Sequence, residues 1–277
     1  MIVMTVLFGH LPAHAEGGQS RFHLLNMKCE AEAHDQMETS PQSPPLNVDD
    51  PATPGCNQWE INILASADLS LDANRYELPL LDINYGVGDN LQLKYEVPNV
   101  SSRSDGTTVS SVGNSKAGIK YMFYENEEAK LHMAFYPQIE FITPQSGAEE
   151  KGLETAGAIV SLPFLLSTKL GQTVLGDVMM TTNLCYNISS KSDTSNSVSL
   201  LAGLGMPLSS KISMMAELST DQAVTQNSEG VRDQLVKSDV GMMVKVFKQV
   251  LLFGSVGGSL YSSDQNHHTY FSTGIRI

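Results

Sequence analysis

Apolar and polar residues alternate one by one along most of the chain after Trp59. The clearest runs span residues 81–85, 91–97, 212–219 and 239–246. Successive side chains of an extended strand point to opposite faces, so an alternation with a period of two predicts strands with one apolar and one polar face. No stretch shows the period of 3.6 residues that is typical of a long amphipathic helix. The pattern therefore predicts an all-β protein.

Short turns and long polar loops alternate between these strands. Residues 86–90, with Gly86 and Gly88, have the composition of a short hairpin turn. Other tight turns are expected at 125–129, 208–210 and 248–249, and longer polar loops at 98–113, 143–152, 189–197 and 221–230. Transmembrane barrels separate their periplasmic and extracellular ends in this way.

The predicted strands number about twelve. They lie near residues 58–70, 77–86, 90–98, 114–124, 130–142, 154–168, 172–188, 197–207, 211–220, 233–247, 249–262 and 267–277. An even number of antiparallel strands lets both ends of a closed barrel lie on the periplasmic side.

Three features favour lipid rather than water around this sheet, although a soluble sandwich would also alternate, with its apolar face inward. Only 17% of the residues are charged, against roughly a quarter in soluble proteins. Aromatic residues gather near the strand ends, as in interfacial girdles. An apparent export signal precedes the strands. We therefore predict a closed antiparallel transmembrane β-barrel in the bacterial outer membrane, with outer-membrane lipid and the barrel-assembly machinery as partners.

The chain before the first strand divides into two parts. Residues 1–15, MIVMTVLFGHLPAHA, are a short apolar run ending in Ala13-His14-Ala15, the small-residue pattern of signal-peptidase cleavage. No Lys or Arg precedes the run, as if the signal peptide were truncated. Residues 16–57 include five prolines between Thr39 and Gly55 and few apolar side chains, so we expect a disordered, proline-rich periplasmic leader. The barrel is expected to span residues 58–277.

Charge and cysteine content exclude some functions. A formal net charge of −13 argues against nucleic acid as a partner, because phosphate binding needs a concentrated basic face. Cys29 and Cys56 are able to pair in an oxidising compartment, and two free thiols are the alternative. No residues have the spacing of metal ligands, so neither a metal nor a cofactor is expected.

Charged residues on the polar strand faces are the candidate functional residues. If the apolar faces meet lipid, these side chains point into the lumen. They either neutralise one another in a filled lumen or line a water-filled path and bias its selectivity. The candidates are Asp82, Lys94, Glu96, Lys120, Glu140, Glu217, Asp239, Lys245 and Arg276.

An enzymatic role is not expected. His267 and His268 with Asp264 and nearby serines contain the residue types of a hydrolase triad, but the two histidines fall in an apparent turn. No nucleophile elbow or phospholipase-like motif accompanies them.

The first predicted strands resemble a known family. WEINILASADLSL, from Trp59, and ELPLLDINYGVGDNLQLKYEVP, ending at Pro98, are similar to the opening of the meta-pathway of phenol degradation family of outer-membrane proteins. The later strands match only by pattern, and the chain ends in Ile277 where many outer-membrane barrels end in Phe or Trp. The resemblance implies an outer-membrane barrel that takes up small hydrophobic or aromatic molecules.

These observations predict a passive channel or uptake protein for small molecules. The alternatives are a structural or enzymatic barrel with a closed lumen and, less favoured, a secreted soluble β-protein. Conductance distinguishes an open barrel from a closed one, and solubility without detergent distinguishes the soluble protein.

Overall fold

The structure is a computed structural model that describes residues 20–22, 29, 39–104, 106–192, 194–226 and 232–277. Within these ranges, no helix has the length and apolar character needed to cross a membrane. The predicted signal peptide at residues 1–15 lies outside the described residues, as does most of the stretch from 16 to 38.

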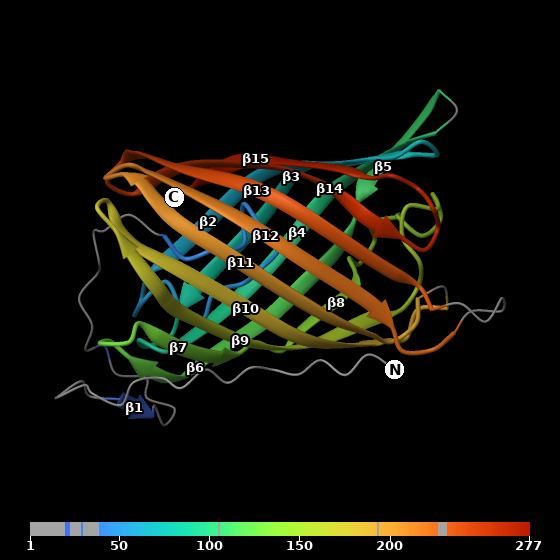
Figure 1. The fold of residues 1–277 in the computed structure, drawn as a ribbon. Helices are drawn as coiled ribbons and strands as arrows, with labels where there is room; N and C mark the ends of the chain where they lie inside the picture. The colour runs from blue at the N-terminus through green and yellow to red at the C-terminus, as the bar shows by residue number, and fades with distance from the viewer. Residues whose placement is uncertain (1–19, 23–28, 30–38, 105, 193, 227–231) are drawn as a thin grey trace.

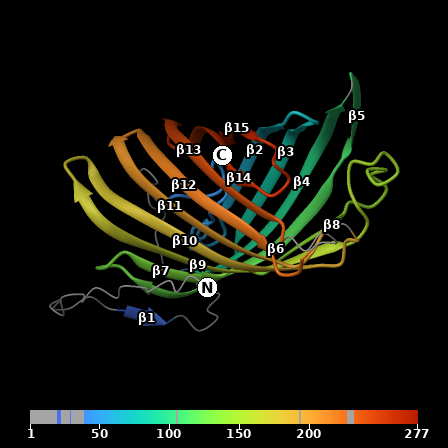
Figure 2. The same ribbon diagram turned by 45° about the vertical axis from the view of Figure 1, so that its right-hand side comes forward.

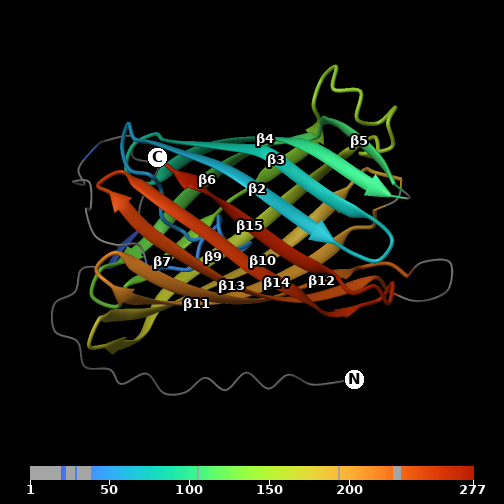
Figure 3. The same cartoon turned by 90° about the horizontal axis from the view of Figure 1, so that it is seen from above.

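The described strands form one antiparallel sheet that closes on itself (Figures 1 and 3). The last strand pairs with the first barrel strand from Thr269↔Leu69 to Arg276↔Asn62. The strands are β1 (Ser20–Phe22), β2 (Trp59–Leu69), β3 (Asn74–Gly86), β4 (Leu91–Ser104), β5 (Thr107–Val112), β6 (Asn114–Asn126), β7 (Leu131–Phe135), β8 (Gln138–Ile142), β9 (Ala158–Thr173), β10 (Gly176–Ser189), β11 (Ser197–Ser209), β12 (Ile212–Ala223), β13 (Gln234–Phe247), β14 (Val250–Ser262) and β15 (Thr269–Arg276).

The predicted twelve-strand barrel is confirmed in the described part of the chain. β7 and β8 are two halves of one barrel strand, because both pair with β6 and with β9. The strand breaks at Tyr136-Pro137, where proline cannot donate a ladder hydrogen bond. β5 extends only the outer part of β4, and β1 pairs with the end of β6. Residues 98–113, expected to be a loop, are therefore largely a β4–β5 hairpin.

The two ends of the barrel differ. We call the end that carries the tight connections 86–91, 126–131, 173–176, 209–212 and 247–250 the short-turn end. The opposite long-loop end carries most of the long connections, including 142–158, 189–197, 223–234 and 262–269. Both the start of β2 and the end of β15 lie at the short-turn end, as the sequence predicts for an even number of strands.

Apolar side chains cover the outside of the barrel, as the alternation predicts. Leu93 and Tyr95 on β4 are exposed, whereas their neighbours Gln92 and Lys94 are buried. The same alternation places Leu184, Leu204, Leu218, Val240 and Leu252 outside on five other strands. An apolar outer wall on a closed, hydrogen-bonded sheet is the surface that a bilayer covers.

A segment from Thr39 to Asn57, which we call the internal segment, lies inside the barrel (Figure 2). The expectation of a disordered leader over residues 16–57 is wrong for this part of it. Pro41, Leu46, Val48 and Pro51 are buried, although their composition is typical of disorder. The barrel wall supplies the apolar surface and hydrogen-bond partners that the segment lacks by itself.

Candidate functional site: the barrel lumen

The internal segment enters and leaves the lumen at the short-turn end. The carbonyl of Thr39 lies beside Gly205, near the end of β11. The chain then crosses to β12, β14 and β15 at Pro45 to Val48 and returns along β10 and β6. It leaves beside Gly86, whose carbonyl accepts a hydrogen bond from the backbone N–H of Asn57 at 2.9 Å. The segment is thus a loop with its apex in the middle of the barrel.

Glu217 holds the apex. Its carboxylate accepts hydrogen bonds from the backbone N–H of Asn47 at 2.8 Å, the amide Nδ2 of Asn47 at 3.1 Å and the backbone N–H of Val48 at 2.7 Å. Glu217 is 4% exposed, so these charge-assisted bonds form away from bulk water. Its neighbours across the sheet are Gly203 and Asp239, neither of which offers a cation. The segment is therefore the partner that this carboxylate would otherwise lack.

Other wall residues bind the segment's backbone on both sides of the apex. Arg276 donates from Nη1 to the side chain of Gln42 and from Nη2 to the carbonyl of Pro44 at 3.1 Å. Asn183 makes a reciprocal pair with Asp49, in which the Asp49 N–H donates at 2.7 Å and the Asp49 carbonyl accepts at 2.7 Å. Both interactions satisfy backbone groups that a proline-rich loop cannot pair internally.

Lys120 links the second half of the internal segment, which returns toward the short-turn end, to the wall. Its ammonium donates to the carbonyl of Ala52 at 3.0 Å, lies 3.9 Å from a carboxylate oxygen of Asp50 and stands 4.9 Å from the centre of the Tyr136 ring. Tyr136 is almost fully buried. It therefore lies in the lumen and not on the outer wall.

The wall facing the internal segment is shaped to receive it. A Cβ atom at Gly203 would stand 2.6 Å from Cβ of Pro41, and one at Gly205 would stand 2.1 Å from the carbonyl oxygen of Thr39. Glycine is thus required at both positions by close approach of the segment. Leu46 and Val48 also join a buried apolar cluster with Leu64, Leu80, Met215, Met243 and Phe253 of the wall.

Three of the predicted lumen residues form one ion-pair group beside the segment. Lys94 lies 3.4 Å from Asp82 and 2.9 Å from Glu96, measured from Nζ to a carboxylate oxygen, and Lys116 lies 3.4 Å from Glu96. Arg276 is also close to Glu60, at 3.4 Å. At this level the space left between segment and wall is about 50 Å³, enough for a few water molecules.

Three further candidates have other surroundings, although Glu140 is the cross-strand neighbour of Lys116. Glu140 pairs with Lys191 at 2.7 Å and accepts a hydrogen bond from Asn114 near the long-loop end. Asp239 is buried and lines a separate cavity. Lys245 is half-buried near the short-turn end of β13. The predicted residues therefore do not form one site. They are spread from the long-loop end through the middle of the lumen to the short-turn end.

His268 is bound by acidic residues at the long-loop end. Its Nδ1 lies 2.8 Å from Asp68, and Nε2 lies 3.7 Å from Asp264. Burial lowers the pKa of His268, but the hydrogen bond and charge of Asp68, together with Asp264, outweigh it and raise the pKa. The pKa of Asp264 is lowered by hydrogen bonds from Ser262 and Asn266. No serine hydroxyl in the described residues is bonded to the imidazole ring, so the geometry of a hydrolase triad is absent there.

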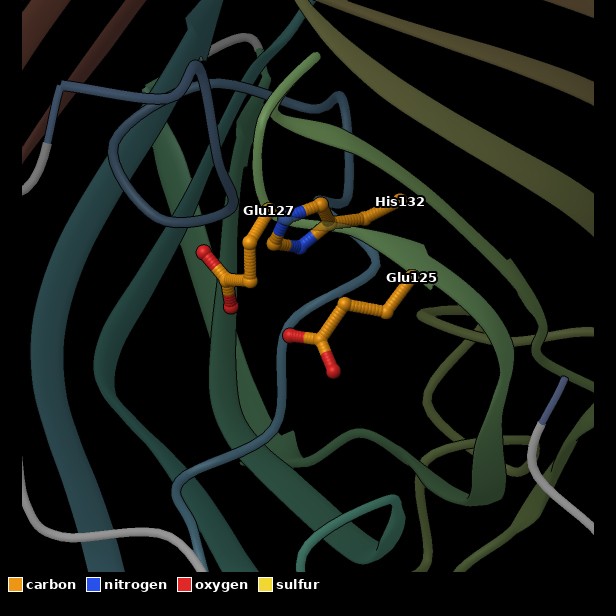
Figure 4. A group of neighbouring side chains, drawn as sticks. All are labelled: Glu125, Glu127 and His132. Atoms are coloured by element: carbon orange, nitrogen blue, oxygen red, sulfur yellow. The ribbon is translucent and has the colours of Figure 1, made fainter. Parts of the chain in front are cut away.

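Glu125, Glu127 and His132 bring ligand atoms within 4.8 Å of one another at the β6–β7 turn (Figure 4). This residue set was not singled out from the sequence. Lys130 already lies 3.8 Å from Glu127, and both side chains are largely exposed. An exposed turn whose carboxylate already has a lysine counter-ion gives no specific reason for a metal ion to bind.

Cys29 and Cys56 are joined in a disulfide, with their Cα atoms 5.3 Å apart. Of the two alternatives that the sequence leaves open, the structure has the bonded one. The bond ties residue 29 to the end of the internal segment, just before β2. Cys185 is free and buried in the barrel.

Comparisons with known proteins identify the fold. No protein-family model and no curated protein matches the sequence. An outer-membrane channel from Pseudomonas putida F1 has a TM-score of 0.60 at 15% identity, covering 83% of this chain and 98% of that one. The KdgM porin in complex with disordered oligogalacturonate has a TM-score of 0.52 at 11% identity, covering 78% and 98%. The translocator domain of the autotransporter NalP from Neisseria meningitidis has a TM-score of 0.51 at 13% identity, covering 83% and 90%.

The chain therefore has the fold of an outer-membrane β-barrel. At such low identities the likeness extends to the fold, and a channel, a porin and a translocator domain share it. The function of this barrel depends on the residues of its own lumen.

Proposed function

We propose that the protein is an outer-membrane channel for small solutes and that the internal segment is its gate. One observation carries this proposal: much of the lumen is filled by a loop that enters and leaves at one end, and not by wall side chains alone. Such a loop is able to withdraw without breaking the barrel, because the strand ladders do not depend on it.

The contacts of the segment support a gate that is stable but removable. Most of its bonds run from polar wall groups to its backbone or polar side chains, and water can replace these when the loop leaves. The wall groups that hold it, Glu217, Arg276, Lys120 and Asn183, would then line a wet lumen. The solute class implied by the family resemblance, small hydrophobic or aromatic molecules, stays a prediction.

Removing the gate tests the function. A variant lacking residues 39–53 is expected to give frequent, long conducting steps in planar bilayers, whereas the full chain stays mostly closed. A second variant, with residues 41–53 replaced by glycine and serine at the same length, keeps the chain connection and removes the wall contacts. Closed barrels resist detergent, so a mobility shift on heating in a detergent gel confirms that each variant is folded.

The rival function is a structural barrel with a permanently closed lumen. Folded variants of both kinds that give no conducting steps would favour this rival and contradict the channel.

A further inference from the structure

A cavity of about 290 Å³ lies between the apex of the internal segment and the wall. Its lining includes Pro45 and Asn47 of the segment and reaches Asp68 and Arg75, near the long-loop ends of β2 and β3. A solute arriving from the long-loop end therefore meets this cavity before it reaches the segment. Its volume is near the lower limit for small-molecule pockets, so it suits a small ligand.

Acidic residues outnumber basic ones in this cavity. Asp68, Glu77 and Asp239 line it together with Arg75 and Lys237. The Arg75 guanidinium lies between Glu77 of the lining, at 4.0 Å, and the carboxylate of Glu154, which is not part of the lining, and it donates to the carbonyl of Leu153. The charge of Arg75 is therefore shared with a carboxylate outside the cavity, and Asp68 is paired with His268 at 2.8 Å. Within the described residues, Asp239 is the lining acid that has no ion pair of 4 Å or less.

Asp239 is the least satisfied of these groups. It is 5% exposed, and its Oδ2 atom is buried without a hydrogen-bond partner among the described residues. Its cross-strand neighbour on β12 is Glu217, another acid. A Cβ atom at Gly257 would lie 2.0 Å from Oδ1, so glycine on β14 is what leaves room for the carboxylate. A buried carboxylate oxygen without a partner is costly, and a bound cation would remove that cost.

The aromatic wall of the cavity already holds a cation. The ammonium of Lys237 lies 5.0 Å from the centre of the Tyr270 ring, within cation–π distance. Lys237 makes no ion pair of 4 Å or less with another described residue. A lysine side chain is long and flexible, so an incoming cation is able to displace it from the ring.

A second cavity, also about 290 Å³, shows the same charge balance on the opposite wall. Of its charged lining residues, Lys116 is paired with Glu96 and Glu140 is paired with Lys191. Asp221 is bound by the hydroxyls of Ser197 and Ser199 and has no cationic partner of 4 Å or less in the described chain. Both cavities thus favour positive charge.

We propose that the cavity above the internal segment binds small organic cations, with Asp239 as the charged partner and the Tyr270 ring as the aromatic one, and makes the channel cation-selective. The selectivity rests on the proposed channel function, whereas the binding does not. Lys237 acts as an internal competitor that a bound cation replaces over the ring.

Binding is tested on the full chain in detergent with tetramethylammonium as the probe. Asp239→Asn, which keeps the shape and removes the charge, is expected to weaken binding at least roughly tenfold. Lys237→Gln is expected to strengthen it, because the competing ammonium is gone. Asp177→Asn, which removes one negative charge at the short-turn end outside the cavity, serves as the matched control. Acetate binding as tightly as tetramethylammonium, or an unchanged affinity in Asp239→Asn, would overturn the proposal.

Selectivity is tested on the variant lacking residues 39–53, which loses Pro45 and Asn47 from the lining but keeps the wall carboxylates Asp239 and Asp221, from its reversal potential in a potassium chloride gradient. Potassium is expected to be preferred over chloride, and Asp239→Asn with Asp221→Asn is expected to reduce that preference. A conducting barrel that prefers chloride contradicts the selectivity alone. A folded barrel that never conducts contradicts the channel function, and the tetramethylammonium measurement then still decides the binding site.

Discussion

Replacing Val240 by Arg is expected to lower the stability of the barrel in lipid by about 2–4 kcal/mol. Val240 lies in the middle of β13 (Gln234–Phe247) and is 52% exposed on the outer wall. At this depth a guanidinium has neither water nor a counter-ion. Equilibrium unfolding of the protein in lipid vesicles, with denaturant, gives the change in the free energy of unfolding.

Phe247→Arg is the matched control, because it puts the same side chain on the outer wall at the end of the same strand. Near the membrane interface the cost is about 0–1 kcal/mol. In a water-soluble barrel both arginines would be harmless. Equal, small effects at the two positions would therefore contradict a lipid-covered outer wall.

Replacing Glu217 by Ala is expected to raise the frequency of channel opening roughly 100-fold, since hydrogen bonds to a charged group contribute about 1.5–3 kcal/mol each and are not additive. The substitution leaves the two backbone N–H groups of Asn47 and Val48 without their acceptor. Single-channel recording of opening frequency in planar bilayers measures the effect. It follows from the gate proposed above.

Asp221→Ala provides the comparison. Asp221 lies on the same strand, β12, but its carboxylate is bound by wall serines and not by the internal segment. Opening frequency should stay at the level of the full chain. Similar opening in both variants would mean that loss of lumen charge, and not release of the segment, opens the channel.

The strand pattern could be predicted from sequence because a period-two alternation is local. Leu93 outside and Lys94 inside follow directly from it, and the buried charges Asp82, Glu217 and Asp239 were found in the same way. The break at Pro137 and the β4–β5 hairpin were missed. Both depend on which neighbouring strand offers a partner, and an alternation within one strand does not contain that information.

The internal segment could not be predicted, because its stability comes from distant residues. Val48 is bound by Glu217, 169 residues away in the chain, and Gln42 by Arg276, 234 residues away. Five prolines and few apolar side chains indicate disorder when composition alone is considered. One feature of the wall could have indicated the segment. Glu217 has Gly203 and Asp239 as its neighbours across the sheet, so the wall gives it no counter-ion. To see from the sequence that Glu217 lacks a counter-ion, one must know the register of β11, β12 and β13.

Covalent continuity with β2 and the disulfide between Cys29 and Cys56 give the internal segment a high effective concentration at its own binding site. A short tether of this kind corresponds to about millimolar ligand. A solute that competes with the segment for the lumen must therefore either have a higher affinity than the untethered segment would have, or be present at about millimolar concentration. If the segment is the proposed gate, the same tether returns it to the lumen after each solute has passed, without the help of a second protein.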